Sequence, residues 1–154
     1  MTPDQIAPNQ IALVQSSWEK VVPIANDAAK LFYGRLFETA PAVRTLFKTD
    51  IQDQGQKLMT VITTVVRGLR NFEKLEMTVW QLGRRHVVYG AVEAHYQVVA
   101  ETLIWTLEQG LGKDFTADVR QAWLDALTII ADVMIAGANF EYANFDVYKA
   151  QQGK

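Results

Sequence analysis

Cysteine is absent from this chain of 154 residues, and its absence excludes several classes of protein at once. Disulfide scaffolds, thiol catalysis, thiolate metal sites and thioether-attached cofactors all need it. Histidine is nearly as scarce, because His86 and His95 are the only two in the sequence. Any chemistry that depends on an imidazole must therefore use one of these two side chains.

An excess of charge of one sign is also lacking. Fifteen Lys and Arg residues oppose seventeen Asp and Glu residues, which gives a formal charge of −2 and no basic face for nucleic acid. The N-terminus, MTPDQIAPNQ, lacks the basic start and apolar stretch of a secretory signal. The most apolar stretch, residues 124–140, contains Asp125 and Asp132 and falls short of the roughly 20 apolar residues of a membrane span. We therefore expect a soluble, cytoplasmic protein without nucleic-acid or membrane partners.

Several common catalytic motifs are missing as well. The sequence contains no GxSxG elbow for a nucleophilic serine and no HExxH, ExxH or EF-hand spacing for zinc, di-iron or calcium sites. The Gly-Leu-Gly-Lys stretch at 110–113 is not a phosphate-binding loop, because Leu107 stands where that motif requires its first glycine.

Helical periodicity dominates the sequence that remains. Apolar residues recur at three- and four-residue spacing in segments 11–21, 28–37, 41–47, 58–69, 75–89, 99–111 and 119–134. Thr116 is a predicted N-cap of the last segment, and Gly110 and Gly112 are predicted to end the one before it. Strand patterns are nearly absent. We predict one all-α domain over residues 1–154, in which residues 144–154 form a polar, frayed tail.

His86 lies on the apolar stripe of its predicted helix, in line with Val79 and Leu82. Two interpretations are open: a core histidine bonded to a backbone carbonyl, or an axial ligand of a haem iron. Other residues suit a haem pocket. Phe47 is an aromatic residue after a proline-initiated turn, and Tyr33 and Gln54 are polar residues beside core segments. Lys57 and Arg85 are cations that could meet the propionates of a haem. Each also has a simpler interpretation, as a core aromatic with its hydroxyl at the surface, a solvated amide or a surface cation.

Two parts of the chain resemble the globin family. Residues 31–47, LFYGRLFETAPAVRTLF, are similar to the globin signature FYxxLFxxxPxvrxLF. Residues 82–90, LGRRHVVYG, and 94–99, AHYQVV, resemble the proximal region of the same family. The similarity covers roughly residues 10–138 and extends to bacterial single-domain haemoglobins, the haem domain of flavohaemoglobins and neuroglobin. It implies a globin fold of about seven to eight helices around a non-covalent haem b.

The resemblance also implies a role for individual residues. His86 matches the iron ligand, Phe47 the aromatic that packs on the haem, and Tyr33 the distal donor to bound dioxygen. Gln54 falls at a second distal position. The other residues implied to line or hold the haem are Lys57, Leu58, Leu82, Arg85, Val92, Tyr96 and Val99. Bound dioxygen accepts hydrogen bonds, which a dry pocket strengthens, so two neutral donors predict high affinity.

The chain departs from its relatives on the proximal side. Flavohaemoglobins and their single-domain relatives share a triad of ligand histidine, tyrosine and glutamate. Tyr96 matches the tyrosine, but the glutamate position falls on Ala138, and Glu141 is one turn away. Without that carboxylate the imidazole gains less negative character, which disfavours peroxidase-like chemistry. His95 follows His86 by nine residues and should lie on the proximal side or rim, so bis-histidine ligation is not expected.

Three functions remain open at this stage. The first is reversible, high-affinity binding of dioxygen, with carbon monoxide and nitric oxide as further ligands. The second is nitric oxide dioxygenation to nitrate, for which a separate reductase must restore the iron, since we expect no attached flavin or NAD domain. The third is a haem-based gas or redox sensor, against which the lack of an output domain argues. The sequence does not predict an oligomeric state.

Overall fold

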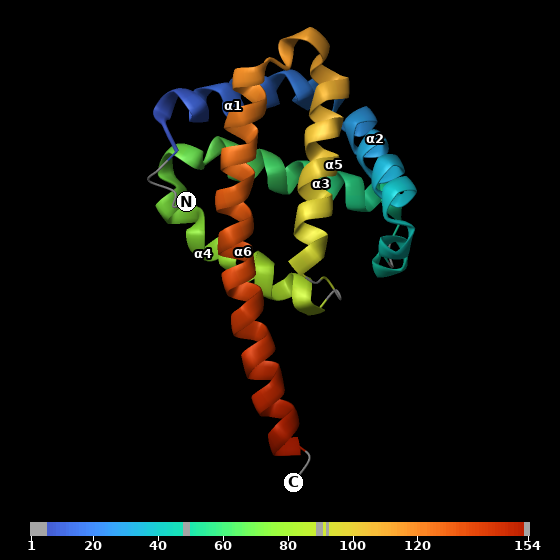
Figure 1. Ribbon diagram of the computed structural model, residues 1–154, viewed down its shortest axis with the longest axis vertical. Coiled ribbons are helices and arrows are strands. Elements are labelled where there is room, and N and C mark those ends of the chain that lie inside the picture. Colours follow the sequence, from blue (N-terminus) through green and yellow to red (C-terminus); the bar gives the residue numbers. More distant parts are fainter. Residues whose placement is uncertain (1–5, 48–49, 89–90, 92, 153–154) are drawn as a thin grey trace.

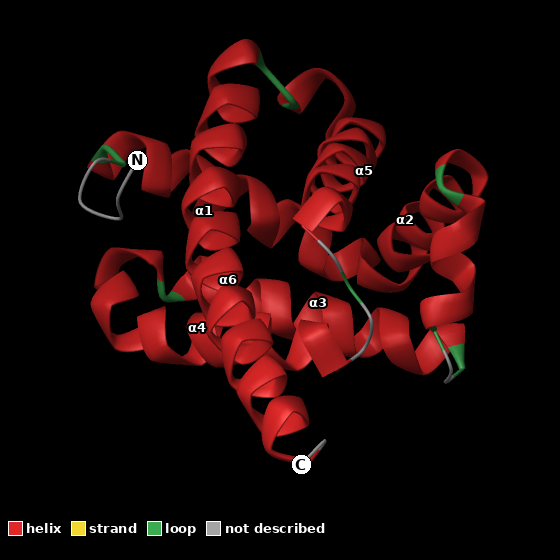
Figure 2. Cartoon of the chain, turned by 60° about the horizontal axis from the view of Figure 1, so that its bottom comes forward, coloured by secondary structure: helices red, strands yellow, loops and turns green. Residues whose placement is uncertain are grey.

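The computed structural model describes residues 6–47, 50–88, 91 and 93–152, and every regular element in those ranges is helical (Figure 2). The α-helices are α1 (Pro8–Val21), α2 (Ala25–Thr39), α3 (Ile51–Arg67), α4 (Phe72–Val88), α5 (Glu93–Leu111) and α6 (Ala117–Gln152). Short 3₁₀ segments join several of them: Val22–Ile24, Pro41–Leu46, Leu69–Asn71 and Gly112–Asp114. The prediction of an all-α fold is confirmed.

The number of α-helices in the described ranges is six, slightly below the seven to eight expected. The difference lies in the segment that begins at Pro41, which forms a 3₁₀ helix instead of an α-helix. Its last bond runs from the amide of Phe47 to the carbonyl of Arg44, three residues back, at 3.2 Å. Such tight segments stay short because their hydrogen-bond geometry is poorer than that of an α-helix.

The helix ends follow recognisable capping chemistry. The Thr116 hydroxyl accepts a hydrogen bond from the amide of Val119 at 3.2 Å, which confirms it as the N-cap of α6. α5 ends at Leu111, and Gly112 follows with φ of +55°, a left-handed conformation that favours glycine. Asp50 caps α3 and accepts from the amides of Gln52 and Asp53 at 2.7 and 3.3 Å. These caps fix where the site-bearing helices begin and end.

The C-terminal end of the chain differs from the prediction. We expected a frayed tail over residues 144–154, but α6 continues to Gln152 and extends beyond the other helices (Figure 1). The sequence explains this continuation, because no proline or glycine interrupts the chain between Gly137 and Gly153. Polar composition alone was therefore a poor indicator of a helix end.

The centre of the core joins α1 to α6 through two buried indole rings. Trp18 and Trp123 pack with ring centroids 5.9 Å apart. The Trp18 indole donates to the Thr63 hydroxyl of α3, and the Trp123 indole donates to the Ser17 hydroxyl of α1, both at 2.9 Å. A buried indole N–H without a partner would be costly, so these bonds let both rings lie inside.

α4 packs mainly against α6, and two glycines bring their backbones together. A Cβ added at Gly83 would meet the carbonyl of Met134, and one added at Gly137 would meet the carbonyl of Trp80. Glycine is therefore required on both sides of the crossing. Because α4 also carries His86, α6 sets the position of the helix that bears the candidate ligand.

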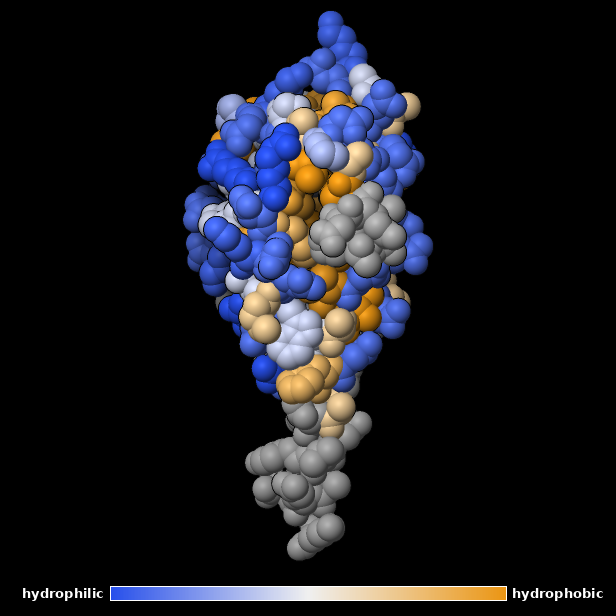
Figure 3. All heavy atoms as spheres, turned by 90° about the vertical axis from the view of Figure 1, so that its left-hand side faces the viewer, coloured by the Kyte–Doolittle hydropathy of each residue, from blue (hydrophilic) through white to orange (hydrophobic). Residues whose placement is uncertain are grey.

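Part of α6, Ala117–Glu141, is long and apolar enough to cross a membrane by length and composition, contrary to our expectation from the sequence. In this fold, however, the same stretch supplies core residues, among them Trp123, Ala126 and Ile129. Its pattern is thus that of a helix packed within a helical body. The face drawn in Figure 3 carries a band of apolar side chains bordered by hydrophilic ones.

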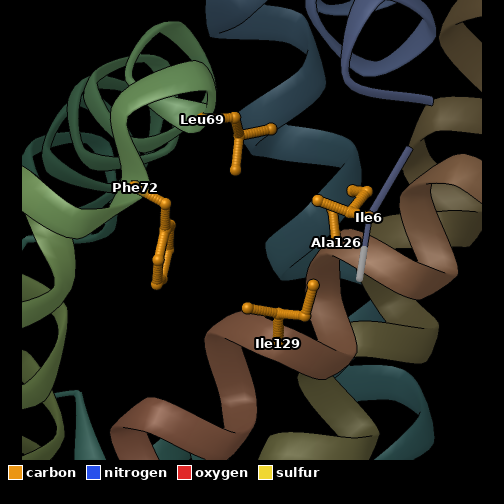
Figure 4. Close-up of a pocket in the computed structure, with 5 residues that line it drawn as sticks. All are labelled: Ile6, Leu69, Phe72, Ala126 and Ile129. Atoms are coloured by element: carbon orange, nitrogen blue, oxygen red, sulfur yellow. The ribbon is translucent and has the colours of Figure 1, made fainter. Parts of the chain in front are cut away.

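A small cavity lies near the start of the described chain. Its lining is entirely apolar and comes from the N-terminal segment, the Leu69–Asn71 turn, α4 and α6 (Figure 4): Ile6, Leu69, Phe72, Ala126 and Ile129. Its volume of about 10 Å³ is close to the space of a single water, and it offers no polar partner to hold one. We assign it no binding role.

Candidate functional site

Three aromatic rings from α2 and the following turn form the first part of the site. Tyr33 meets the edge of Phe47 at 5.3 Å and lies 5.7 Å from Phe37, and Phe37 and Phe47 are 5.4 Å apart. The turn from Pro41 folds the chain back, so that Phe47 returns to α2. Phe47 itself is only half-buried, which leaves part of its ring available to a further group.

The Tyr33 hydroxyl points inward instead of to the surface. Its side chain is 5% exposed, and its hydroxyl donates to the backbone carbonyl of Gln54 at 3.4 Å. Gly55 allows this approach, because a Cβ at that position would lie 2.9 Å from the Cβ of Ala29. Burial raises the pKa of Tyr33 to about 12, so the phenol keeps its proton at neutral pH and remains a donor. The contact involves the backbone of Gln54, so the predicted role of its side-chain amide stays a prediction.

His86 is half-buried on α4, with its Nδ1 atom 2.7 Å from the carbonyl oxygen of Leu82. A carbonyl only accepts, so Nδ1 carries the hydrogen, and in the neutral ring Nε2 holds the lone pair that a metal would bind. Burial lowers the pKa of His86, Arg85 lowers it further, and the bond to Leu82 opposes both. This bond fits a core histidine and an iron ligand alike, because ligating histidines generally donate their other N–H to such a partner.

Tyr96 stands beside His86, with ring centroids 6.1 Å apart and an angle of 33° between the planes. The position expected for a proximal glutamate is Ala138, which is buried. The nearby Glu141 accepts a hydrogen bond from the Arg84 guanidinium at 2.7 Å. The Glu141 carboxylate is thus paired with Arg84 of α4. This agrees with the sequence, in which no glutamate falls at the position of the proximal triad.

Apolar side chains from α3, α4 and α5 contact the core without being fully buried, and they include the predicted residues Leu58, Leu82 and Val99. Half-buried apolar surface on three successive helices, one of which carries His86, would suit a flat apolar group such as a haem. Lys57 and Arg85 are exposed, as cations at a rim would be. Val92 lies outside the described residues.

Some residues that shape the site were not singled out from the sequence. Phe37 was read as a core residue only, yet it completes the ring cluster with Tyr33 and Phe47. Gly55 and Gly83 were not recognised as close-contact positions. A glycine inside a helical pattern is the signal for such contacts, since it costs helix stability and needs a packing reason.

Comparisons with known proteins identify the family of the chain. The globin family model matches residues 30–134. Neuroglobin-1 of Oncorhynchus mykiss is 30% identical over 87% of this chain and 93% of its own length, and neuroglobin of Danio rerio is 29% identical over the same shares. These relatives are vertebrate neuroglobins, so the similarity to bacterial single-domain haemoglobins seen in the sequence stays a prediction.

Solved structures show the same fold. One is an engineered carbene transferase made from a putative nitric oxide dioxygenase of Rhodothermus marinus, with a TM-score of 0.80, 23% identity, and 94% of this chain and 99% of that one covered. Another is a hexacoordinated heme protein from an anhydrobiotic tardigrade, with a TM-score of 0.79, 17% identity, and 88% and 96% covered. With the family model and the neuroglobin relatives, this shared architecture means that the chain belongs to the globin family.

Proposed function

We propose that this globin, in the cytoplasm, holds a b-type haem through His86 and binds dioxygen reversibly with high affinity. The observation that carries the proposal is the state of His86. Its Nδ1–H is engaged by the Leu82 carbonyl, burial lowers its pKa, and Nε2 is thereby the atom with a lone pair. When bound, ferrous haem supplies an iron that binds diatomic gases.

On the proximal side, each neighbour of His86 has a definite task. The Leu82 carbonyl fixes the tautomer and restricts rotation of the imidazole. The Tyr96 ring lies alongside and limits the tilt of the same ring. The half-buried apolar side chains of Leu82 and Val99 would help to keep water from a haem held there, and Leu58 would do the same at the ligand pocket.

On the distal side, Tyr33 holds a proton on its hydroxyl and offers it to a polar ligand. Its bond to the Gln54 carbonyl measures 3.4 Å, at the long end of useful hydrogen bonds, so giving it up costs little. A phenol donor at this position would favour dioxygen over carbon monoxide, because dioxygen is the better hydrogen-bond acceptor of the two when a haem holds it. The raised pKa keeps this donor protonated over the whole physiological range.

Nitric oxide dioxygenation is the alternative, since one structural neighbour was engineered from a putative nitric oxide dioxygenase and the same Tyr33 donor would serve that reaction. That reaction requires a separate reductase to restore ferrous iron. Sustained nitrate formation from nitric oxide, dioxygen and a reducing system would favour it. A single stoichiometric conversion would favour dioxygen binding.

Absorption spectra of oxidised, dithionite-reduced and carbon monoxide-bound protein test the proposal. We expect a Soret band and a five-coordinate reduced spectrum that shifts with carbon monoxide. The His86→Ala variant should lose stable haem binding, whereas His95→Ala, the matched control, should keep it. Absence of a Soret band after haem addition, or an unchanged spectrum in His86→Ala, would overturn the assignment.

A further inference from the structure

A groove of about 430 Å³ lies between α5 and α6, and none of its lining residues belongs to the candidate haem site. The two helices run antiparallel and side by side (Figure 1). The α5 wall includes Glu101, Ile104, Trp105 and Glu108, and the α6 wall includes Arg120 and Leu124. The groove is thus part of an outer face of the molecule.

The floor of the groove is apolar and held in place. Ile104 is buried, Trp105 is half-buried, and the Arg35 guanidinium of α2 lies over the Trp105 ring at 5.1 Å. Leu124 on the α6 wall is 37% exposed, and Leu31, one turn before Arg35, is 41% exposed. Leu124 therefore leaves apolar surface of α6 open at the groove.

The two walls carry charges of opposite sign. Glu101 and Glu108 stand on α5, and Arg120 stands on α6. Among the residues that the structure describes, none of these three takes part in an ion pair within the chain. A surface with negative charge on one wall and positive charge on the other is complementary to a second copy of itself after a two-fold rotation.

We propose that this groove is the interface of a homodimer, in which the α5 and α6 helices of two copies pack as a four-helix arrangement. Charge decides the pairing of the walls. Setting α5 against α5 would bring four carboxylates together, whereas setting α5 against α6 of the second copy places Glu101 and Glu108 opposite Arg120. Leu124 of each copy then packs on the floor formed by Ile104 and Trp105 of the other.

Charge reversal tests this pairing directly. Sedimentation velocity of the wild-type protein across the micromolar range should show a concentration-dependent dimer. Arg120→Glu should weaken dimerisation by about tenfold or more, because the contact occurs twice per dimer. Glu101→Lys with Glu108→Lys should do the same. The triple variant should restore wild-type association, since it reverses the sign of both walls.

Controls separate the interface from folding. Leu124→Asp should give a monomer, while Met77→Asp, which alters a 64% exposed apolar residue on α4, should leave the dimer intact. Circular dichroism checks that each variant keeps its helices. A wild-type protein that stays monomeric, a dimer insensitive to Arg120→Glu and Leu124→Asp, or a triple variant that fails to recover would each overturn the proposal. None of these readouts depends on haem.

Discussion

Replacement of Tyr33 by phenylalanine removes one hydroxyl and almost nothing else from the site. In the protein without ligand, the hydroxyl makes a single 3.4 Å bond to the Gln54 carbonyl. A bond that long contributes little, so Tyr33→Phe should change the free energy of unfolding by less than about 1 kcal/mol. The ring contacts with Phe37 and Phe47 remain in the variant.

The same change should have a much larger effect on dioxygen release. A hydrogen bond to a charged acceptor contributes about 1.5–3 kcal/mol. Because each 1.4 kcal/mol is about a factor of ten, release from Tyr33→Phe should be about tenfold to a hundredfold faster. Stopped-flow displacement of dioxygen by carbon monoxide measures this rate. Carbon monoxide release should change far less, because that ligand is a poorer acceptor.

The pH dependence adds a second criterion. Burial raises the pKa of Tyr33 to about 12, so the wild-type release rate should be constant between about pH 6 and 10. An unchanged release rate in Tyr33→Phe would refute the assignment of Tyr33 as the donor. Equal acceleration of dioxygen and carbon monoxide release would also refute it, because a steric effect would act on both ligands.

Other predictions concern the helix that carries His86 and the charge of its ring. Gly137→Ala should lower the free energy of unfolding, measured by urea titration, by about 1–3 kcal/mol, because the new Cβ meets the Trp80 carbonyl. Gly34→Ala is the control, since open space surrounds that position, and it should be neutral or stabilising. Because burial lowers the folded-state pKa of His86, the haem-free protein should lose stability as the pH falls below the unfolded value of about 6.5 and through the lower folded value. His86→Gln should flatten that dependence, and an equally steep curve in this variant would assign it to other groups.

Local chemistry explains what could be predicted from the sequence. Thr116 and Gly112 act through hydrogen bonds and backbone angles within a few residues of themselves, so their positions identified the ends of α6 and α5. Tyr33 and Gln54 were predicted together because the family resemblance fixed their relative places, and the structure brings the Tyr33 hydroxyl to the backbone carbonyl of Gln54.

Contacts between distant segments were the part that the sequence could not supply. Gly83 and Gly137 are ordinary glycines until the crossing of α4 and α6 brings their backbones together. Likewise, Glu141 was placed one turn away from the expected glutamate position, and only the crossing of α4 and α6 shows that its carboxylate pairs with Arg84. The length of α6 was misjudged because polar residues were taken as a helix end, although no residue there breaks a helix.

The dependence of α4 on α6 has a consequence for protein synthesis. His86 is translated well before Met134, Gly137 and Glu141, the residues against which its helix rests. While the ribosome is still adding α5, the imidazole sits on a helix without its main packing partner. If His86 binds the haem as proposed, the nascent chain acquires a fixed ligand geometry only when its last helix emerges, and cofactor capture is expected among the final events of maturation.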